Sequence, residues 1–210
     1  MEEDAAASED TANSVAALKR ALENEKNAPD ILRYQHDVVA QLKSDLESQQ
    51  DAVDALLGGG REAFASTLYQ MEIDRVKYLL ASYLRTRLFK IERLAAYLTD
   101  PDNAALRELM SKEEWHYAEK YMECVHGHFK ACVLGQLPEM FQGLFEKGGD
   151  VDMVPKPNMD KFVFSRAEGD VGSVPMDEAG TAALIRKGDI YALRYHPVSG
   201  TVSDGDMSLL

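Results

Sequence analysis

Apolar side chains in the first two-thirds of the chain recur every three or four residues, which is the spacing of one helical face. This pattern predicts a first helix from Ser14, a residue suited to a helix cap, to about Lys26. Three further helices are expected over residues 35–57, 61–98 and 104–134. The breaks between these helices fall at Pro29, Gly58–Gly60 and Pro101, and Pro138 ends the last helix.

The pattern changes after Lys147. Short apolar runs then alternate with turn residues, and these runs are KFVFS, TAALIR, IYALRY and DMSLL. Such runs bounded by Gly, Pro and Asp predict strands. We therefore expect an α+β protein: a mainly α-helical bundle of long helices at 14–147, followed by a small β-rich domain at 148–210. The acidic residues 1–13 are expected to form a disordered tail.

Composition narrows the class of function. The net charge of −13 disfavours a direct grip on bare DNA, because phosphate binding needs a concentrated positive field. Two cysteines do not make a disulfide framework, and the first residues lack the apolar region of a signal peptide. No stretch reaches the roughly 18 apolar residues of a membrane span. We expect a soluble nuclear or cytoplasmic protein with protein partners, no membrane contact, and DNA contact that is indirect or weak.

The segment 71–98 is basic inside this acidic chain, with three acidic and six basic residues. At about 100° per residue its bases spread over several sides of the helix, whereas a DNA-reading helix would align them. The apolar side chains instead gather in one arc, which predicts a core-facing stripe. The stripe consists of Ile73, Val76, Leu80, Leu84, Leu88, Ile91, Leu94, Ala95 and Leu98.

Two features of this helix predict contacts with other groups. Arg87 falls inside the apolar arc, so its guanidinium must be paired or must reach solvent along its stem; we expect a carboxylate partner. Met71, Tyr78 and Phe89 cluster on the opposite side. A helix that is apolar on two faces is covered on both. We expect another subunit on the second face, the alternative being the fourth helix and the β-domain of the same chain.

Other positions are candidates for contacts. Trp115 lies on the fourth helix, where it serves either the core or an interface. The chain ends on Leu209–Leu210, although chain ends are usually polar. We expect this pair to seat the β-domain against the helices or a neighbouring subunit. Pro155 and Pro157, with Lys156 between them, stiffen the connection and are expected to position the β-domain.

The sequence contains few residues that are candidates for catalysis or metal binding. The run CVHGHFKAC contains the zinc-ligand types Cys124, His126, His128 and Cys132. On a straight helix Cys124 and Cys132 lie about 12 Å apart, too far to share one ion, and a zinc site would need a break of the helix at Gly127. The acidic pairs Glu113–Glu114 and Asp177–Glu178 are expected to be solvated surface and turn. Familiar catalytic motifs are missing, so we expect no enzyme, no metal and no cofactor.

Three motifs carry a resemblance to a known family. MEIDRVKYLLASYLRTRLFKIERL, from Met71, resembles the M-E-x-x-R-x-x-Y-x-L-x-S-Y-L-R-x-R-L-x-K-I-E segment of GINS complex subunits of the Sld-five type. NEKNAPDIL and VPKPNMDKFVF are similar to that family's N-E-K-x-A-P-x-L-L and V-P-K-P-x-x-D-x-x-V-F. RYHPV and the final LL resemble its closing strands. The GGG loop, the sequence from Ala118 to Leu134 and the middle of the β-domain depart from the pattern.

This resemblance implies a non-enzymatic subunit of the four-protein GINS assembly, acting in the nucleus with three sister subunits. That assembly joins the ring-shaped MCM helicase and the Cdc-forty-five protein at eukaryotic replication forks, as a scaffold and activator of the helicase. It also implies a helical A domain followed by a small β-rich B domain. Without the resemblance, an acidic helical adaptor of another nuclear or cytoplasmic complex explains the same residues.

Overall fold

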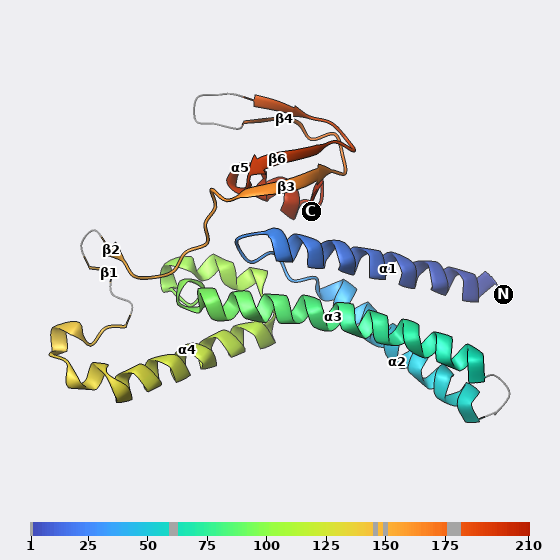
Figure 1. Ribbon diagram of the computed structural model, residues 1–210, viewed down its shortest axis with the longest axis horizontal. Coiled ribbons are helices and arrows are strands. Elements are labelled where there is room, and N and C mark those ends of the chain that lie inside the picture. The colour runs from blue at the N-terminus through green and yellow to red at the C-terminus, as the bar shows by residue number, and fades with distance from the viewer. Residues whose placement is uncertain (1, 59–62, 145–146, 149–150, 176–181) are drawn as a thin grey trace.

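A computed structural model of the chain describes residues 2–58, 63–144, 147–148, 151–175 and 182–210. The N-terminal part consists of long helices, of which α3 is the longest and contacts the other three (Figure 1). These helices are α1 (Glu2–Asn27), α2 (His36–Gly58), α3 (Ala63–Leu98) and α4 (Lys112–Cys132), followed by the short turns η2 (Leu134–Gln136) and η3 (Glu139–Phe141).

The buried stripe of α3 holds the helical part together. Ile73, Val76 and Leu80 pack into a core shared with α1 and α2. Ile91 and Leu94, further along the same stripe, belong to a second core that includes Ala118 of α4. A single long helix therefore organises both cores. Leu84 and Leu88, expected in this stripe, are only partly buried, whereas the neighbouring Tyr83 is almost completely buried.

The first helix begins earlier than expected. α1 starts at Glu2, whereas the sequence suggested a disordered tail up to residue 13. Residues 5–7 are alanines, the strongest helix formers, and acidic residues near a helix N-terminus interact favourably with its dipole. High charge alone was therefore a poor guide to this segment.

The fourth helix begins later than expected. A 3₁₀ segment, η1 (Pro101–Leu109), occupies the beginning of the predicted helix 104–134, and α4 itself starts at Lys112. Ser111 caps α4: its side chain accepts from the Glu114 backbone N–H at 3.1 Å, and the Glu114 carboxylate accepts from the Ser111 N–H at 3.0 Å. This reciprocal capping box fixes the start of α4.

The β-domain contains an antiparallel sheet and a separate hairpin. The sheet order is β6-β3-β7, and the hairpin pairs β4 with β5. A two-residue ribbon, β1 with β2, precedes the domain. The strands are β1 (Lys147–Gly148), β2 (Val151–Asp152), β3 (Phe162–Ala167), β4 (Gly172–Pro175), β5 (Ala182–Ile185), β6 (Ile190–Arg194) and β7 (Met207–Leu209).

The segment RYHPV, expected to resemble a closing strand, instead enters a helix, α5 (Tyr195–Ser203). Pro197 lies in the first turn of α5, where its missing N–H costs no helical hydrogen bond. Tyr195, Val198 and Val202 recur at helical spacing and are buried in the β-domain core. The α+β class, with long helices followed by a small strand-rich domain, is confirmed.

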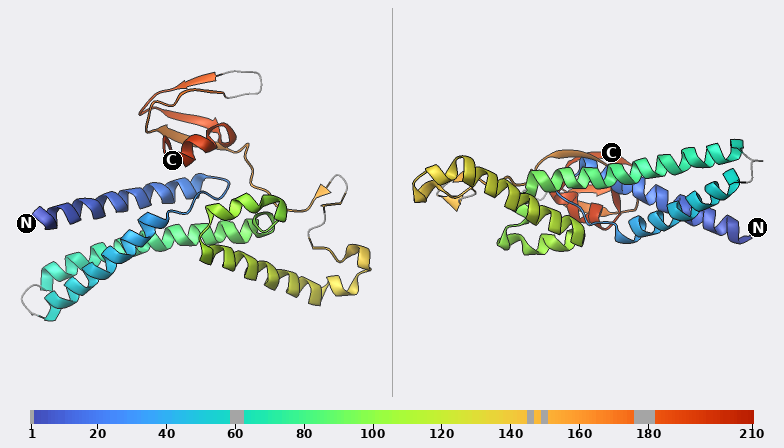
Figure 2. Two further views of the ribbon diagram at one scale, coloured as in Figure 1. Left: turned by 180° about the vertical axis from the view of Figure 1, so that it is seen from behind. Right: turned by 90° about the horizontal axis from the view of Figure 1, so that it is seen from below.

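The β-domain packs on the C-terminal part of α1, far from it in sequence (Figures 1 and 2). Ala28, next to the end of α1, is buried in the core of the β-domain. The backbone N–H of Leu209 donates to the side-chain oxygen of Asn24 at 2.7 Å, and the Tyr195 hydroxyl donates to Asp30 at 2.6 Å. These residues, Asn24, Ala28, Asp30, Tyr195 and Leu209, form what we call the domain junction.

Candidate protein-interaction site

Arg87, near the middle of α3, is completely buried, and each of its five N–H groups has an acceptor. Nε and Nη2 donate to the two carboxylate oxygens of Glu114 at 2.8 and 3.0 Å. Nη1 donates to Glu25 at 3.0 Å and to the carbonyl of Leu32 at 2.7 Å. Nη2 also donates to the carbonyl of Leu109 at 3.0 Å. One side chain thus joins α3 to α1, η1, α4 and the segment after α1.

A second cation balances the charges around Arg87. Lys90 Nζ donates to Glu25 at 2.8 Å, so two cations face two carboxylates, the arrangement that makes buried charges tolerable. The guanidinium carbon lies 5.3 Å from the ring centroid of Tyr34 and 5.8 Å from that of Tyr83, within cation–π range. We call the charged group the buried charge centre; it consists of Arg87, Lys90, Glu25 and Glu114.

Burial and ion pairing shift the pKa values of these cations in opposite directions. Burial lowers the pKa of Arg87, but the Glu114 and Glu25 carboxylates outweigh it, and the net pKa is raised above its ordinary value. For Lys90 burial prevails over the Glu25 carboxylate and lowers the pKa. Burial also raises the pKa of Tyr83 to about 12. Arg87 is therefore a permanent charge with a structural role and is unsuited to proton transfer.

The carboxylate partners of Arg87 include one that the sequence misplaced. Glu113–Glu114 was expected to be solvated, yet Glu114 is only 6% exposed. Its neighbour Glu113 is exposed, in accord with that expectation. The signal that identifies Glu114 is the spacing Ser111-x-x-Glu114, which predicts a capping box. The other pair, Asp177–Glu178, lies outside the described residues.

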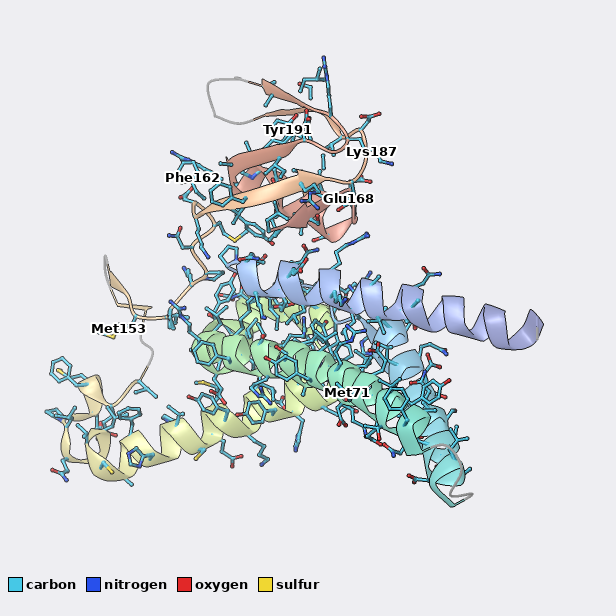
Figure 3. The ribbon with its side chains drawn as sticks, turned by 45° about the vertical axis from the view of Figure 1, so that its right-hand side comes forward. Met71, Met153, Phe162, Glu168, Lys187 and Tyr191 are labelled. Carbon is cyan, nitrogen blue, oxygen red and sulfur yellow. The ribbon has the colours of Figure 1, made fainter. Side chains whose placement is uncertain are left out.

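The opposite side of α3 is apolar and exposed. Met71 is 64% exposed, Tyr78 68% and Phe89 66%, so the chain's own helices and β-domain leave them largely uncovered (Figure 3 labels Met71). Phe64 and Leu68 are also exposed and continue the same line. At about 100° per residue these five side chains project within an arc of about 80°. We call them the α3 stripe.

A second exposed apolar group lies at the far end of α4. Phe129 is 43% exposed, Met140 71% and Phe141 59%. Trp115, one of the predicted contact residues, lies nearer the start of α4. It is partly buried against the chain's own core, with the Arg107 guanidinium carbon 5.1 Å from its ring. Intrachain packing thus occupies much of the Trp115 ring.

The predicted contact residues at the C-terminus have two different environments. Leu209 is completely buried in the β-domain core at the junction with α1, so it packs on the chain's own helix, which is the first of the two surroundings expected for it. Leu210 is 43% exposed, and its N–H donates to the Phe164 carbonyl at 2.9 Å. The terminus therefore seats the β-domain on the chain's own helix.

The connection to the β-domain runs without regular structure through residues 155–158. Pro155 and Lys156 are exposed, whereas Pro157 is partly buried. Pro157 and Met159 line a cavity of about 200 Å³ whose other walls include Leu94 and Leu98 of α3. The proposed positioning role of this segment remains a prediction.

The cysteine–histidine run of α4 is not gathered into a metal centre. Cys124 and Cys132 are both exposed and unpaired with each other, and His128 lies 3.8 Å from the Cys132 sulfur. Within the described ranges, no three His, Cys, Asp or Glu side chains are grouped to hold a metal ion. Among the helices that the structure describes, none has the length and apolarity to cross a bilayer.

Comparisons with known proteins agree with this architecture. Residues 14–133 match the family described as the GINS complex protein helical bundle domain, and residues 157–210 match the DNA replication complex GINS protein SLD5 C-terminus. The chain is 33% identical over 203 residues to the DNA replication complex GINS protein SLD5 of Arabidopsis thaliana, an alignment covering 94% of this chain and 91% of the relative.

More distant relatives show the same full-length correspondence. The chain is 31% identical over 188 residues to the protein of that name in Schizosaccharomyces pombe, covering 89% of this chain and 87% of the relative. It is 28% identical over 210 residues to the human protein, covering 95% and 90%. Both structural parts are thus matched in the same order, and the chain belongs to the Sld5 family of GINS complex proteins.

Proposed function

We propose that this chain is a non-enzymatic structural subunit of the four-protein GINS complex, and that the α3 stripe is where sister subunits pack. The observation that carries the proposal is the exposure of Met71, Tyr78 and Phe89 on one face of a helix whose other face packs into the core. Large apolar side chains aligned on a solvent face indicate a protein interface. Three sister subunits would supply the helices that cover the stripe.

The buried charge centre supports this role by making the helical part rigid. Arg87 fixes α3 against α1 and α4, and the domain junction fixes the β-domain on α1. A rigid subunit holds its interface in one geometry and loses little conformational freedom on assembly. The extended segment Pro155–Lys156–Pro157 limits the path between the two domains and completes the proposed positioning.

At the level of the replication fork, the assembled complex would act as scaffold and activator of the MCM helicase ring together with the Cdc-forty-five protein, in the nucleus. The mechanism is geometric: the subunits hold the ring in its active arrangement, and ATP hydrolysis in the ring supplies the work. The support within this chain is that the buried charge centre has two cations facing two carboxylates and is held by hydrogen bonds, which suits a structural role.

The proposal is tested by co-expression of the chain with the three sister subunits. Tyr78→Glu together with Phe89→Glu places two charges in the proposed interface, and we expect the yield of co-purified sister subunits to fall at least tenfold, since burying an unpaired charge is strongly unfavourable. The readout is the recovery of each subunit on a tag carried by this chain.

Ala81→Glu is the matched control, because Ala81 is exposed on α3 but lies outside the stripe. It introduces one such charge on the same helix and is expected to leave assembly intact. Equal recovery of the sister subunits with the double variant and with the control would refute an interface at the α3 stripe. Circular dichroism of each variant checks that α3 remains folded.

A further inference from the structure

The short segment that follows α1 contacts both domains. Ala28 is 3% exposed and belongs to the core of the β-domain, and Leu32 packs against the same core. Ile31, next to Leu32, is also 3% exposed but belongs to the second helical core, which α3 shares with α4. We call residues 28–32 the connector, because its side chains are divided between the helices and the β-domain.

Two cations of α3 hold the backbone of the connector. Lys90 Nζ donates to the Asp30 carbonyl at 2.7 Å, and Arg87 Nη1 donates to the Leu32 carbonyl at 2.7 Å. Both cations also bind Glu25 near the end of α1, at 2.8 and 3.0 Å respectively. Hydrogen bonds from charged donors are stronger than those between neutral groups. Water has little access to these bonds, since the Lys90 side chain is only 12% exposed and Arg87 is completely buried.

The side chain of Asp30 extends this network into the β-domain. Its carboxylate accepts from the Tyr195 hydroxyl of α5 at 2.6 Å, and Tyr195 is completely buried. Burial raises the pKa of the Asp30 carboxyl, although Tyr195 and Lys90 act against this shift. Asp30 is thus bonded to α3 through its backbone and to α5 through its side chain. A hydrogen-bonded chain therefore runs from the buried charge centre through the connector to the β-domain.

The core of the β-domain takes few apolar residues from the helical part. Among the buried residues that the structure describes in this core, Ala28 alone comes from outside the β-domain, and Leu32 adds a partly buried side chain. A small, polar interface between domains of one chain allows them to move relative to each other. The position of the β-domain therefore depends on polar contacts, which are those of the connector and the hydrogen bond between Leu209 and Asn24.

We propose that Lys90 and Arg87 are positioning residues for the β-domain. By holding the connector on α3 they set the orientation of the β-domain, although their own hydrogen bonds end on the helices and on the connector. The orientation of the β-domain relative to α3 is thus determined from within the helical part. This inference goes beyond the proposed function and stands without it, because it concerns the geometry of the full chain and not its partners.

A role limited to stabilising the helices would need only part of this network. The bonds of the two cations to Glu25 and Glu114 join helix to helix and serve that purpose. The bonds to the Asp30 and Leu32 carbonyls have a different effect, because they fix a segment whose side chains contact the β-domain. Loss of these carbonyl bonds should therefore change the position of the β-domain while the helices stay together.

The test measures the distance between spin labels on the two domains by double electron–electron resonance. Labels are attached at Arg20→Cys in α1 and Lys187→Cys in the β-domain (Figure 3), both exposed positions, after Cys124 and Cys132 are replaced by serine. The full chain is expected to give one narrow distance distribution. Lys90→Met should broaden this distribution at least twofold, because the connector loses one of the two donors that hold its backbone.

A second label pair separates movement of the β-domain from loosening of the helices. Arg20→Cys with Arg93→Cys reports the distance between α1 and α3, and both positions are exposed. This distribution should keep its width in Lys90→Met, because Arg87 still joins α3 to α1 and α4. Equal broadening of both distributions would overturn the proposal, since Lys90 would then only stabilise the helices.

Two further variants complete the test. Tyr195→Phe breaks the network at its β-domain end and leaves every charge in place, and it should also broaden the distribution between α1 and the β-domain. Lys77→Met is the matched control, because it removes a lysine of α3 whose ammonium donates to Gln50 of α2, and it should leave both distributions unchanged. An unchanged distance between α1 and the β-domain in Lys90→Met or in Tyr195→Phe would refute positioning through the connector.

Discussion

At Arg87, one side chain supplies five hydrogen bonds that hold α3 to four other segments of the chain. A buried guanidinium is stable only when all its donors are used and its charge is balanced, and both conditions are met here. The neighbouring Tyr34 and Tyr83 rings exclude water and add cation–π attraction. Arg87 therefore links these segments to α3, and this role requires the planar guanidinium with its five donors.

Arg87→Lys is expected to destabilise the chain by about 2–4 kcal/mol, because a lysine has three donors and so loses at least two of the five buried hydrogen bonds and the planar, two-pronged contact with Glu114. The measurement is the midpoint of unfolding in denaturant, followed by circular dichroism. Arg85→Lys, at an exposed position of the same helix, is the control and should change stability by less than about 0.5 kcal/mol. An equal loss of stability in both variants would show that the hydrogen bonds of Arg87 do not link these segments as proposed.

The buried tyrosines predict a loss of stability at alkaline pH. Burial raises the pKa of Tyr83 from 10.0 to about 12, and burial also raises the pKa of Tyr195. The unfolded chain therefore ionises first, so the stabilisation is complete below pH 10 and is lost as the pH rises toward 12. For Tyr83 alone the loss is about 2–3 kcal/mol.

Denaturant unfolding at several pH values between neutrality and pH 12 measures this effect. The Tyr83→Phe variant should show a shallower decline, because it removes one of the tyrosines whose pKa is raised in the folded chain. If the wild-type chain and the variant lose stability in parallel, ionisation of Tyr83 does not contribute.

At the scale of elements, a few polar contacts hold the β-domain on α1. Asn24 is 9% exposed on α1, and its side-chain oxygen accepts the Leu209 N–H of β7 at 2.7 Å. Asn24→Ala leaves that buried N–H without a partner, which costs about 1–3 kcal/mol at the junction. We expect hydrogen exchange of the Leu209 amide to accelerate by at least tenfold.

Asn27→Ala serves as the control for this prediction, since the Asn27 side chain donates only to the nearby Glu23 carbonyl in the same helix. Exchange at Leu209 should then match the wild-type rate. Unchanged protection of Leu209 in Asn24→Ala would mean that the apolar contacts around Ala28 hold the junction without this hydrogen bond.

The existence of the elements could largely be predicted from the sequence, because it depends on local pattern. The helical spacing located the long helix, and the burial of Arg87 followed from its place in the apolar arc. Boundaries were less accurate: the 3₁₀ segment before α4 and the helix α5 depend on capping and on tertiary packing. The pairing of Arg87 with Glu25 joins residues far apart in the chain, and no local spacing encodes it.

The packing partner of Leu209 could not be predicted from local spacing either. Its apolar character indicated packing, but only the fold shows that the packing partner is α1 of the same chain. The wheel projection, in contrast, placed Tyr78 and Phe89 on the side of α3 opposite the buried stripe, and the structure shows that the chain's own segments leave both exposed. Local periodicity therefore predicted the surface, whereas the junction required the three-dimensional structure.

At the scale of the molecule, the chain is an elongated helical arm with a β-domain on one end of α1 (Figures 1 and 2). α3 lies at the centre of this arm and separates a buried face, packed on α1, α2 and α4, from the exposed α3 stripe. An elongated chain exposes a large surface for its mass. An apolar stripe on that surface is expected to be buried against other chains.

Hydroxyl-radical footprinting of Tyr78 and Phe89 tests this account most directly. The labelling rate of each residue is compared between the chain alone and the chain assembled with the other subunits of the GINS complex, with buried Tyr83 as the internal reference. The account predicts rapid labelling of Tyr78 and Phe89 in the isolated chain, protection of both by at least tenfold in the complex, and slow labelling of Tyr83 in both states. Equally rapid labelling of Tyr78 and Phe89 in the complex would contradict it.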